Sequence, residues 1–363
     1  MTIYIFIFLL LIIFALMGSK DRKLDSTFFV VEIIMLTLLL CFRYGQGSDY
    51  HNYEGIFEGQ KYISGLAYEK EKLFALFNML IARLGWSYSA FVGLVGLICM
   101  LFTYRGIYKL SSIKTVSILL LFPTYYLTYY FSAIREGIAL SMTIGVVLPL
   151  ILEKKWKTAL LSILFISFIH QSSIIMLIML LNIPWHRYRK LILTGSAVFG
   201  IGLWGALQYV TINIHELTFS PSYTAVVIRL GVFILISVLF EKSEKSPETQ
   251  KLYDIYLIGL CIYLCAFAAA LFSQRGTAYF KIVEILLIPN MLGYIVPVSA
   301  TDCRYAMRKT VFTGMIALCV IEGIKNLASY PQQMNYPEHI SFYNYPYISI
   351  FDKEQEKLYK DGI

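Results

Sequence analysis

Residues 116–152, VSILLLFPTYYLTYYFSAIREGIALSMTIGVVLPLIL, decide the fold class of this protein. Apolar residues fill this stretch, and its only charged side chains are the adjacent Arg135 and Glu136. A membrane-spanning helix needs about 20 mainly apolar residues, within a range of about 17 to 25. The runs 116–132 and 136–152 each meet that length, so we predict two consecutive membrane helices that turn at Arg135.

The composition of the whole chain extends this prediction beyond one stretch. Of the 363 residues, 58% are hydrophobic and 15% are charged, whereas an ordinary soluble domain has about 25% charged residues. Because charged side chains cover the surfaces of soluble folds, this composition excludes a soluble enzyme, a disordered scaffold and a secreted disulfide-rich domain. The long continuous apolar runs exclude an outer-membrane barrel, whose strands alternate in hydrophobicity over about ten residues.

We predict an all-α, polytopic helical bundle with about 12 transmembrane helices. The apolar runs of sufficient length are 2–17, 27–42, 88–104, 116–132, 136–152, 191–210, 222–240, 252–272, 277–299 and 310–325. Residues 158–183 are predicted as two short helices that meet at a polar break, and 73–85 as an interfacial or re-entrant helix. We expect one transmembrane domain over 1–325, with a loop at 43–72 and a tail at 326–363.

Basic residues indicate the orientation of these helices. Six loops carry three Lys or Arg residues each, and the predicted spans between them place all six on one side. Because cytoplasmic loops accumulate Lys and Arg, that side is the cytoplasm. The same rule accounts for the net charge of +8 without a nucleic-acid partner. We therefore expect the loop 43–72, the tail 326–363 and both termini to be extracytoplasmic.

Four groups of polar residues lie toward that side, and the first is RYGQGSDYHNY at residues 43–53. If a helix starts after Ser48, which is a suitable N-cap, Asp49 and Tyr53 share one helix face. Arg43 then sits at the membrane boundary, where it could meet a lipid phosphate. The structural alternative is a capped interfacial helix with a snorkelling Arg43.

The second group surrounds Arg135 at the outer end of a Tyr-rich span. An arginine at this depth is costly unless it is paired or faces water. It either pairs with Glu136 or a lipid headgroup, or serves as a fixed cation for a pyrophosphate, which arginine binds through two parallel hydrogen bonds.

The third group is His170-Gln171-Ser172-Ser173, at the polar break between the two short helices. Irregular backbone at membrane depth is tolerated only inside protein or beside an aqueous cavity. A lone histidine is more often structural than catalytic. At an outward-facing break, however, neutral His170 could accept a proton near pH 7, so we favour a functional role.

The fourth group, SQRGTAYFK at residues 273–281, places Arg275 and Tyr279 one helical turn apart at a predicted outer turn. Arg229 lies within another span and belongs with the other outward arginines. The sequence has no Walker loop and no HExxH, GxSxG or Rossmann glycine motif, so ATP-driven transport and metallopeptidase chemistry lose support. We expect neither a metal nor a cofactor.

Together these motifs resemble the EpsG-like branch of the Wzy group, the membrane polymerases of bacterial O-antigens, capsules and exopolysaccharides. The residues that carry the resemblance are Arg43 with Gly47-Ser48-Asp49-Tyr50 and Tyr53, Arg135-Glu136-Gly137-Ile138-Ala139, Phe168-Ile169-His170-Gln171-Ser172, Arg275 with Tyr279-Phe280 and Pro289, and Tyr345-Pro346-Tyr347. Their order covers nearly the whole chain. Two positions depart from the family pattern, because Ser48 stands where Thr is expected and Glu136 where Gln is usual.

The resemblance implies a GT-C-like glycosyltransferase in the bacterial cytoplasmic membrane, with its active face outside. Its donor would be a glycan on undecaprenyl pyrophosphate and its acceptor a lipid-linked repeat unit. The acceptor hydroxyl would attack the anomeric carbon, and the lipid pyrophosphate would leave. A chain-length regulator and a flippase would be its protein partners.

Residue roles follow from that implied reaction. Arg135 and Arg275 would stabilise the charge on the leaving pyrophosphate, with Arg43 as a third contact. His170 and Asp49 are both candidates to accept the proton of the attacking hydroxyl, and we prefer His170. The remaining expected substrate-binding residues are Tyr50, Tyr53, Arg229 and Tyr279.

Three other functions remain open at this point. A ligase or a membrane sugar acyltransferase could use the same histidine and arginines. A flippase or exporter of lipid-linked oligosaccharides would commonly show internal repeats, which this sequence lacks. A subunit that binds glycan without chemistry is the third, and substitution of Arg135 would test it.

Overall fold

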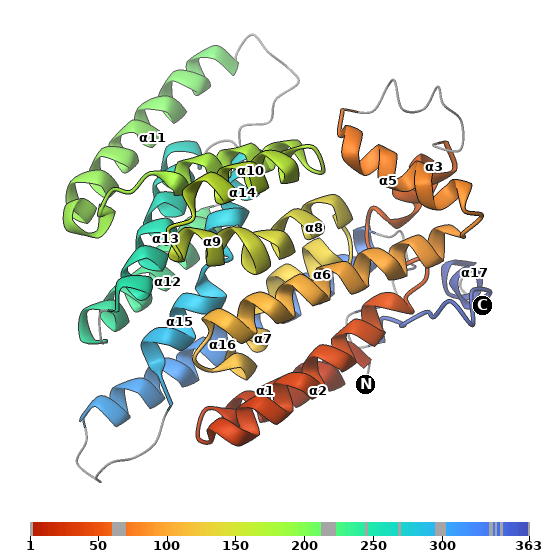
Figure 1. The fold of residues 1–363 in the computed structure, drawn as a ribbon, viewed down its shortest axis with the longest axis horizontal. Coiled ribbons are helices and arrows are strands. Elements are labelled where there is room, and N and C mark those ends of the chain that lie inside the picture. Colours follow the sequence, from red (N-terminus) through yellow and green to blue (C-terminus); the bar gives the residue numbers. More distant parts are fainter. Residues whose placement is uncertain are drawn as a thin grey trace.

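The computed structural model of the chain describes residues 3–59, 70–211, 223–243, 246–267, 270–294, 303–333, 337, 340–341 and 344–361 (Figure 1). These residues are almost entirely helical, and no strand occurs among them, which confirms the all-α class. Residues 60–69 of the predicted loop 43–72, and parts of the predicted tail, lie outside the described residues.

The helical elements follow one another along the chain, with π-helical η1 and η2 and 3-10-helical η3 and η4. They are α1 (Ile3–Gly18), α2 (Arg22–Cys41), α3 (Tyr50–Gly59), α5 (Lys72–Arg83), α6 (Tyr88–Leu110), α7 (Lys114–Leu121), η1 (Phe122–Tyr130), α8 (Ile134–Met142), η2 (Thr143–Val147), α9 (Leu148–Leu152), α10 (Trp156–Ser167), η3 (Gln171–Leu180), η4 (Trp185–Tyr188), α11 (Arg189–Thr211), α12 (Tyr223–Lys242), α13 (Pro247–Ala266), α14 (Ala270–Lys281), α15 (Glu284–Leu292), α16 (Cys303–Gln333) and α17 (Gln355–Asp361).

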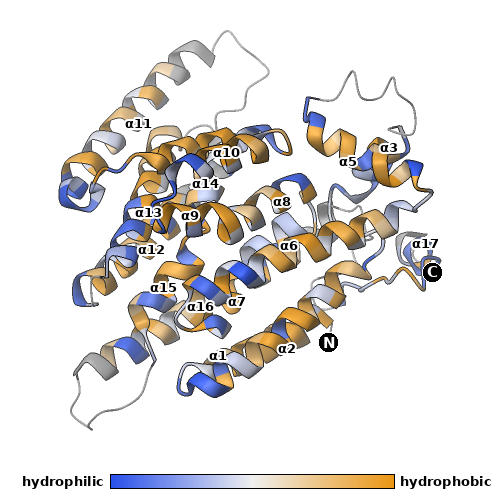
Figure 2. Ribbon diagram, in the orientation of Figure 1, coloured by the Kyte–Doolittle hydropathy of each residue, from blue (hydrophilic) through white to orange (hydrophobic). Residues whose placement is uncertain are grey.

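Four helical stretches of the described residues are long and apolar enough to cross a membrane. They are Arg22–Cys41, Tyr88–Leu110, Ile134–Leu152 and Ala306–Ser329. Shorter apolar helices are Ile3–Gly18, Trp156–Ser167 and Gln171–Leu180. Figure 2 shows hydrophobic residues along these helices and hydrophilic ones near many of their ends. The chain is therefore a multi-pass membrane protein.

The outer surface of the bundle agrees with that conclusion. Large apolar side chains such as Phe6, Ile34, Leu101 and Leu161 are exposed, the last by 66%. Large exposed apolar surfaces are rare on soluble monomers. Lipid chains are the neighbours that such side chains require.

One predicted span and the turn before it differ in the structure. The sequence predicts a single span over 277–299 after an outer turn at Arg275, and residues 295–299 of that run lie outside the described residues. Instead, Arg275 lies inside α14, and the break falls at Ile282-Val283, between α14 and α15. Two successive β-branched residues lower helix propensity at that point. By contrast, the predicted break near His170 is confirmed, because α10 ends at Ser167 and η3 begins at Gln171.

Small residues bring α8 and its continuation against α6. A Cβ atom added to Gly145 would collide with the Phe102 carbonyl oxygen, and one added to Gly106 would collide with Ile144. Close backbone approach at glycine is a common way to pack membrane helices. The π-helical turns η1 and η2 flank α8 on both sides, and such turns are frequent at functional sites.

Candidate functional site

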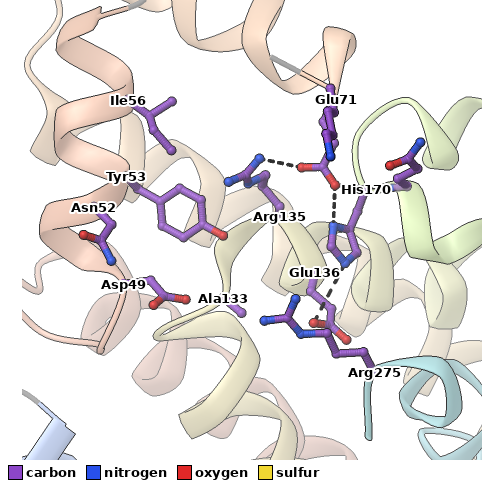
Figure 3. A pocket seen from close by; sticks show the side chains of 12 residues that line it. Asp49, Asn52, Tyr53, Ile56, Glu71, Ala133, Arg135, Glu136, His170 and Arg275 are labelled. Atoms are coloured by element: carbon purple, nitrogen blue, oxygen red, sulfur yellow. Dashed lines mark hydrogen bonds and ion pairs between the residues drawn. The ribbon is translucent and has the colours of Figure 1, made fainter. Parts of the chain in front are cut away.

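A polar cavity of about 460 Å³ lies between α3, α5, α8, α14 and the break before η3 (Figure 3). Its lining residues are Asp49, Asn52, Tyr53, Ile56, Lys70, Glu71, Ala133, Arg135, Glu136, His170, Gln171 and Arg275. Five of the nine predicted site residues are among them, although they come from four distant segments of the sequence. The cavity is large enough for a few sugar units or a diphosphate, because small-molecule sites begin at about 300 Å³.

The α3 wall of the cavity depends on two glycines with left-handed backbone. Gly45 has φ +62 and Gly47 has φ +105, conformations that only glycine adopts at little cost. A Cβ atom on Gly47 would also collide with the carbonyl oxygen of Phe131. After this turn α3 begins at Tyr50, and the Tyr53 amide donates to the Asp49 carbonyl. The predicted helix start after Ser48 is confirmed within one residue.

Glu71 is the centre of the hydrogen bonds in the cavity. Its Oε2 accepts from Arg135 Nη1 at 2.7 Å. Its Oε1 accepts from His170 Nδ1 at 2.7 Å and from the backbone amide of Gln171 at 3.0 Å. Burial raises the pKa of this carboxyl, but the hydrogen bonds from His170 and the Gln171 amide, with the positive charge of Arg135, outweigh burial and lower the pKa overall. Glu71 is therefore held as a carboxylate.

The same contacts fix the orientation of the His170 ring. A neutral imidazole carries one hydrogen, and the short contact with Glu71 assigns it to Nδ1. The Nε2 lone pair is then an acceptor. Nε2 is buried, has no hydrogen-bond partner in the described part of the chain and lies 3.9 Å from Glu136 Oε2. A separation of 3.9 Å is too long for a direct hydrogen bond.

Arg135 supports this arrangement from α8. Its guanidinium lies 5.0 Å from the centre of the Tyr53 ring and 5.3 Å from that of Phe74, within cation–π range. The partner of Arg135 is thus the distant Glu71, whereas the adjacent Glu136 is directed toward His170. Arg135 joins the α3 wall to the His170 wall.

Arg275 enters the cavity from α14, and its side chain is exposed. No ion pair is found for it among the described residues, unlike Arg135. Glu136 is 4% exposed, and its Oε1 has no hydrogen-bond partner within the ranges that the structure describes. Arg275 therefore presents a cation to any anionic group that enters the cavity.

The other four predicted site residues lie outside the cavity lining, and two of them belong to the first segment. Arg43 is 1% exposed, donates to the Tyr130 carbonyl at 2.9 Å and stacks on Phe131 at 4.7 Å. Tyr50 is buried against Tyr44 and Tyr88. Both side chains are buried inside the protein, where they pack beneath the segment 43–53.

The remaining two lie near α14. Arg229 Nη2 donates to Thr277 Oγ1 at 3.3 Å, and its guanidinium covers the Tyr263 ring at 4.8 Å. The Tyr279 hydroxyl is 3.3 Å from Ser172 Oγ, two residues after His170. Tyr279 is fully buried, and through Ser172 it contacts the start of η3, directly after the break.

Sequence reasoning missed Glu71 as a site residue. It lies in a run of charged residues before α5, where nothing in the local pattern distinguishes one carboxylate from another. Asn52, Lys70 and Gln171 were not singled out as site residues either. No three His, Cys, Asp or Glu side chains of the described ranges are close enough to hold a metal ion.

The helical fold and this charged cavity define a multi-pass membrane protein with an enzyme-like polar site. The EpsG family model matches residues 26–336, so the chain belongs to the EpsG family. This family consists of membrane polysaccharide polymerases of the glycosyltransferase type. No curated protein and no solved structure matches the chain.

Proposed function

We propose that this protein polymerises a bacterial surface polysaccharide at the outer face of the cytoplasmic membrane. Its donor is a glycan on undecaprenyl pyrophosphate, and its acceptor is a lipid-linked repeat unit. The observation that carries this proposal is the cavity itself, in which an oriented imidazole and Arg275, which has no carboxylate partner among the described residues, line one space. A displacement from a pyrophosphate needs a proton acceptor at one end and a cation at the other.

His170 is the proton acceptor in this proposal. The Nδ1–H bond to Glu71 leaves the Nε2 lone pair as the acceptor, and this atom, which is buried beside Glu136, is uncovered when the acceptor sugar enters the cavity. As the hydroxyl oxygen bonds to the anomeric carbon, its proton moves to Nε2 and the carbon–oxygen bond to the pyrophosphate breaks. The Glu71 carboxylate stabilises the imidazolium that forms, which is the usual work of a carboxylate behind a catalytic histidine. We expect inversion at the anomeric carbon from this single displacement.

Arg275 binds the leaving pyrophosphate. Negative charge develops on the departing phosphate oxygen, and a cation already in place lowers the barrier without reorganisation. The guanidinium of Arg135 is paired with Glu71, and this pairing supports a role other than the phosphate binding expected from the sequence. We assign it to positioning Glu71 and Tyr53, with only secondary contact to phosphate.

The α3 wall binds sugar. Asp49 and Asn52 offer polar atoms for hydroxyl groups, and Tyr53 offers a ring edge. Asp49 is the alternative proton acceptor, but none of the described residues orients its carboxylate as Glu71 orients His170.

The membrane topology follows the basic loops. We keep the prediction of about 12 crossings in a GT-C-like bundle. Lys154 and Lys155 lie at one end of α9, whereas Arg135 lies at the start of α8. The positive-inside rule thus assigns the cavity to the extracytoplasmic side, where lipid-linked repeat units are polymerised.

The test is the ladder of surface polysaccharide from a strain that lacks the gene. Wild type should restore the ladder, whereas His170→Ala and Arg275→Ala should leave single repeat units at normal protein level. His186→Ala is a matched control, because its Nδ1 contacts Asp254 at 2.8 Å outside the cavity. Long chains in the deletion strain would refute polymerisation, and loss of even the single unit from the surface would favour a flippase.

A further inference from the structure

The segment 344–361 runs beside the connection between α2 and α3 (Figure 1). We call this segment the C-terminal strap. It lies beyond residues 26–336, which match the family. Its contacts with the chain before α3 are numerous and specific.

Backbone hydrogen bonds form the first set of contacts between the strap and the chain before α3. The Tyr44 amide donates to the Ile348 carbonyl at 2.9 Å, and the Ile350 amide donates to the Phe42 carbonyl at 2.9 Å. Together they make an antiparallel bridge between Arg43 and Ser349. The strap therefore satisfies backbone groups of a segment that has no regular structure of its own.

A buried amide forms the second part. Gln46 is fully buried; its Nε2 donates to the Pro346 carbonyl at 2.5 Å, and its Oε1 accepts from the Tyr4 hydroxyl at 2.7 Å. The Tyr347 hydroxyl donates to the Leu39 carbonyl at 2.9 Å. Both groups of this amide are used, so the strap fixes the turn between the two left-handed glycines.

An ionic contact forms the third part. Glu356 is 7% exposed, and its Oε1 lies 2.7 Å from His51 Nε2. The other ring nitrogen of His51 lies 2.9 Å from Glu54 Oε2. The Glu356 carboxyl also fills the space beside Gly45, where an added Cβ would be 2.5 Å from its carbon. One side chain of the strap thus contacts both the turn and the first turn of α3.

These contacts matter because α3 forms one wall of the cavity. Asp49, Asn52 and Tyr53 all follow the strapped turn within a few residues. The opposite wall, with His170 and Glu71, belongs to other elements and has its own hydrogen bonds. A loose strap would therefore displace the sugar-binding wall while leaving the His170–Glu71 pair in place.

We propose that the C-terminal strap is a positioning element, which holds the α3 wall and so sets the affinity of the cavity for its substrate. The substrate in this statement rests on the proposed function. Glu356 and Gln46 are the positioning residues. The expected signature is a rise in KM for the lipid-linked unit with little change in kcat, because the imidazole and Arg275 keep their places.

The first experiment measures Glu356→Ala in the full-length protein in detergent, with Glu354→Ala as the matched control. Glu354 is exposed and lies on the same segment. Hydrogen–deuterium exchange of residues 43–59 should rise at least about tenfold in Glu356→Ala, corresponding to about 1.4 kcal/mol, and stay at the wild-type value in Glu354→Ala. Exchange around residues 165–175 should not change.

A second pair of variants keeps the test independent of the charge. Gly45→Ala introduces a Cβ against Glu356 and strains a left-handed residue, whereas Gly59→Ala meets no atom within 4 Å. Gly45→Ala should reproduce the effect of Glu356→Ala on exchange and on KM, at a melting temperature that shows a folded bundle. Gly59→Ala should match wild type.

These outcomes distinguish a failure of the positioning role of the strap from a failure of the proposed function. Unchanged exchange over 43–59 in both Glu356→Ala and Gly45→Ala would overturn the strap. A fall in kcat at constant KM would also overturn it as a device for binding. Raised exchange in a protein that never polymerises lipid-linked units would support the strap and refute the proposed function.

Discussion

Replacing Glu71 by Gln tests the central arrangement of the site. Glu71 accepts hydrogen bonds on both oxygens, from Arg135 on Oε2 and from His170 and the Gln171 amide on Oε1. A glutamine has the same size but only one acceptor oxygen. If that oxygen faces His170, the amide NH₂ meets the Arg135 guanidinium, and the opposite rotamer sets NH₂ against the imidazole N–H.

The structure gives the size of the expected effect. At least one hydrogen bond to a charged group is lost, and such bonds contribute about 1.5–3 kcal/mol. If the loss falls wholly on the oriented imidazole, the rate decreases by about 10- to 150-fold. Loss of the correct tautomer would add to this, because general-base catalysis contributes about 10²- to 10⁴-fold.

The assay is the initial rate of polymer formation by purified protein in lipid nanodiscs, with a lipid-linked repeat unit as both donor and acceptor. Glu153→Gln is the matched control, because Glu153 also contacts two cations, Lys109 and Lys155, but lies outside the cavity. We expect Glu71→Gln to lose at least tenfold in kcat and Glu153→Gln to match wild type. A Glu71→Gln enzyme within threefold of wild type would refute the role of this carboxylate.

Four further outcomes are expected. Arg275→Ala should lower kcat by about 100- to 1000-fold. The kcat of Arg275→Lys should lie between those of wild type and Arg275→Ala, because lysine keeps the charge but loses the paired donors. Equal rates for wild type and both variants would remove Arg275 from the leaving-group site. Since the folded-state pKa of Glu71 is lowered, its contribution to stability is complete above the unfolded pKa of about 4.3 and lost as the pH falls through the folded value; the acid-induced decrease in Tm should be smaller in Glu71→Gln, and an identical decrease would contradict this. Asp49→Asn should raise KM at nearly constant kcat, and an inactive Asp49→Asn beside an active His170→Ala would make Asp49 the base. Gly47→Ala should lower the Tm, because strain of this kind costs about 1–3 kcal/mol and a Cβ would meet the Phe131 carbonyl; an unchanged Tm would show that this turn is free to move.

Much of the fold follows from the sequence because length and hydropathy are local properties. The runs 88–104 and 136–152 became helices close to their predicted positions, and the break at His170 was visible as a polar interruption. The break after Lys281 was not visible, because Ile282 and Val283 are as apolar as their neighbours. Hydropathy indicates which residues are buried but gives little information about where a buried helix ends.

The site was predictable in part for the same reason. Charged residues are costly in a membrane, so they stand out in an apolar sequence. Arg135, His170 and Arg275 could be identified in this way, and all three line one cavity. Arg43 was equally conspicuous, but its side chain is buried and donates a hydrogen bond to the Tyr130 carbonyl. Glu71 could not be recognised, because its importance comes from partners about 64 and 99 positions away.

The spread of the cavity along the sequence has a consequence for biosynthesis. The ribosome delivers Asp49 and Tyr53 early, His170 midway and Arg275 only with α14. Until α14 is inserted, the growing chain holds His170 and the α3 wall but lacks Arg275, the cation that α14 brings to this cavity. Under the proposed function, a partly synthesised protein is inert toward lipid-linked sugars, and competence is reached in one late step of membrane insertion.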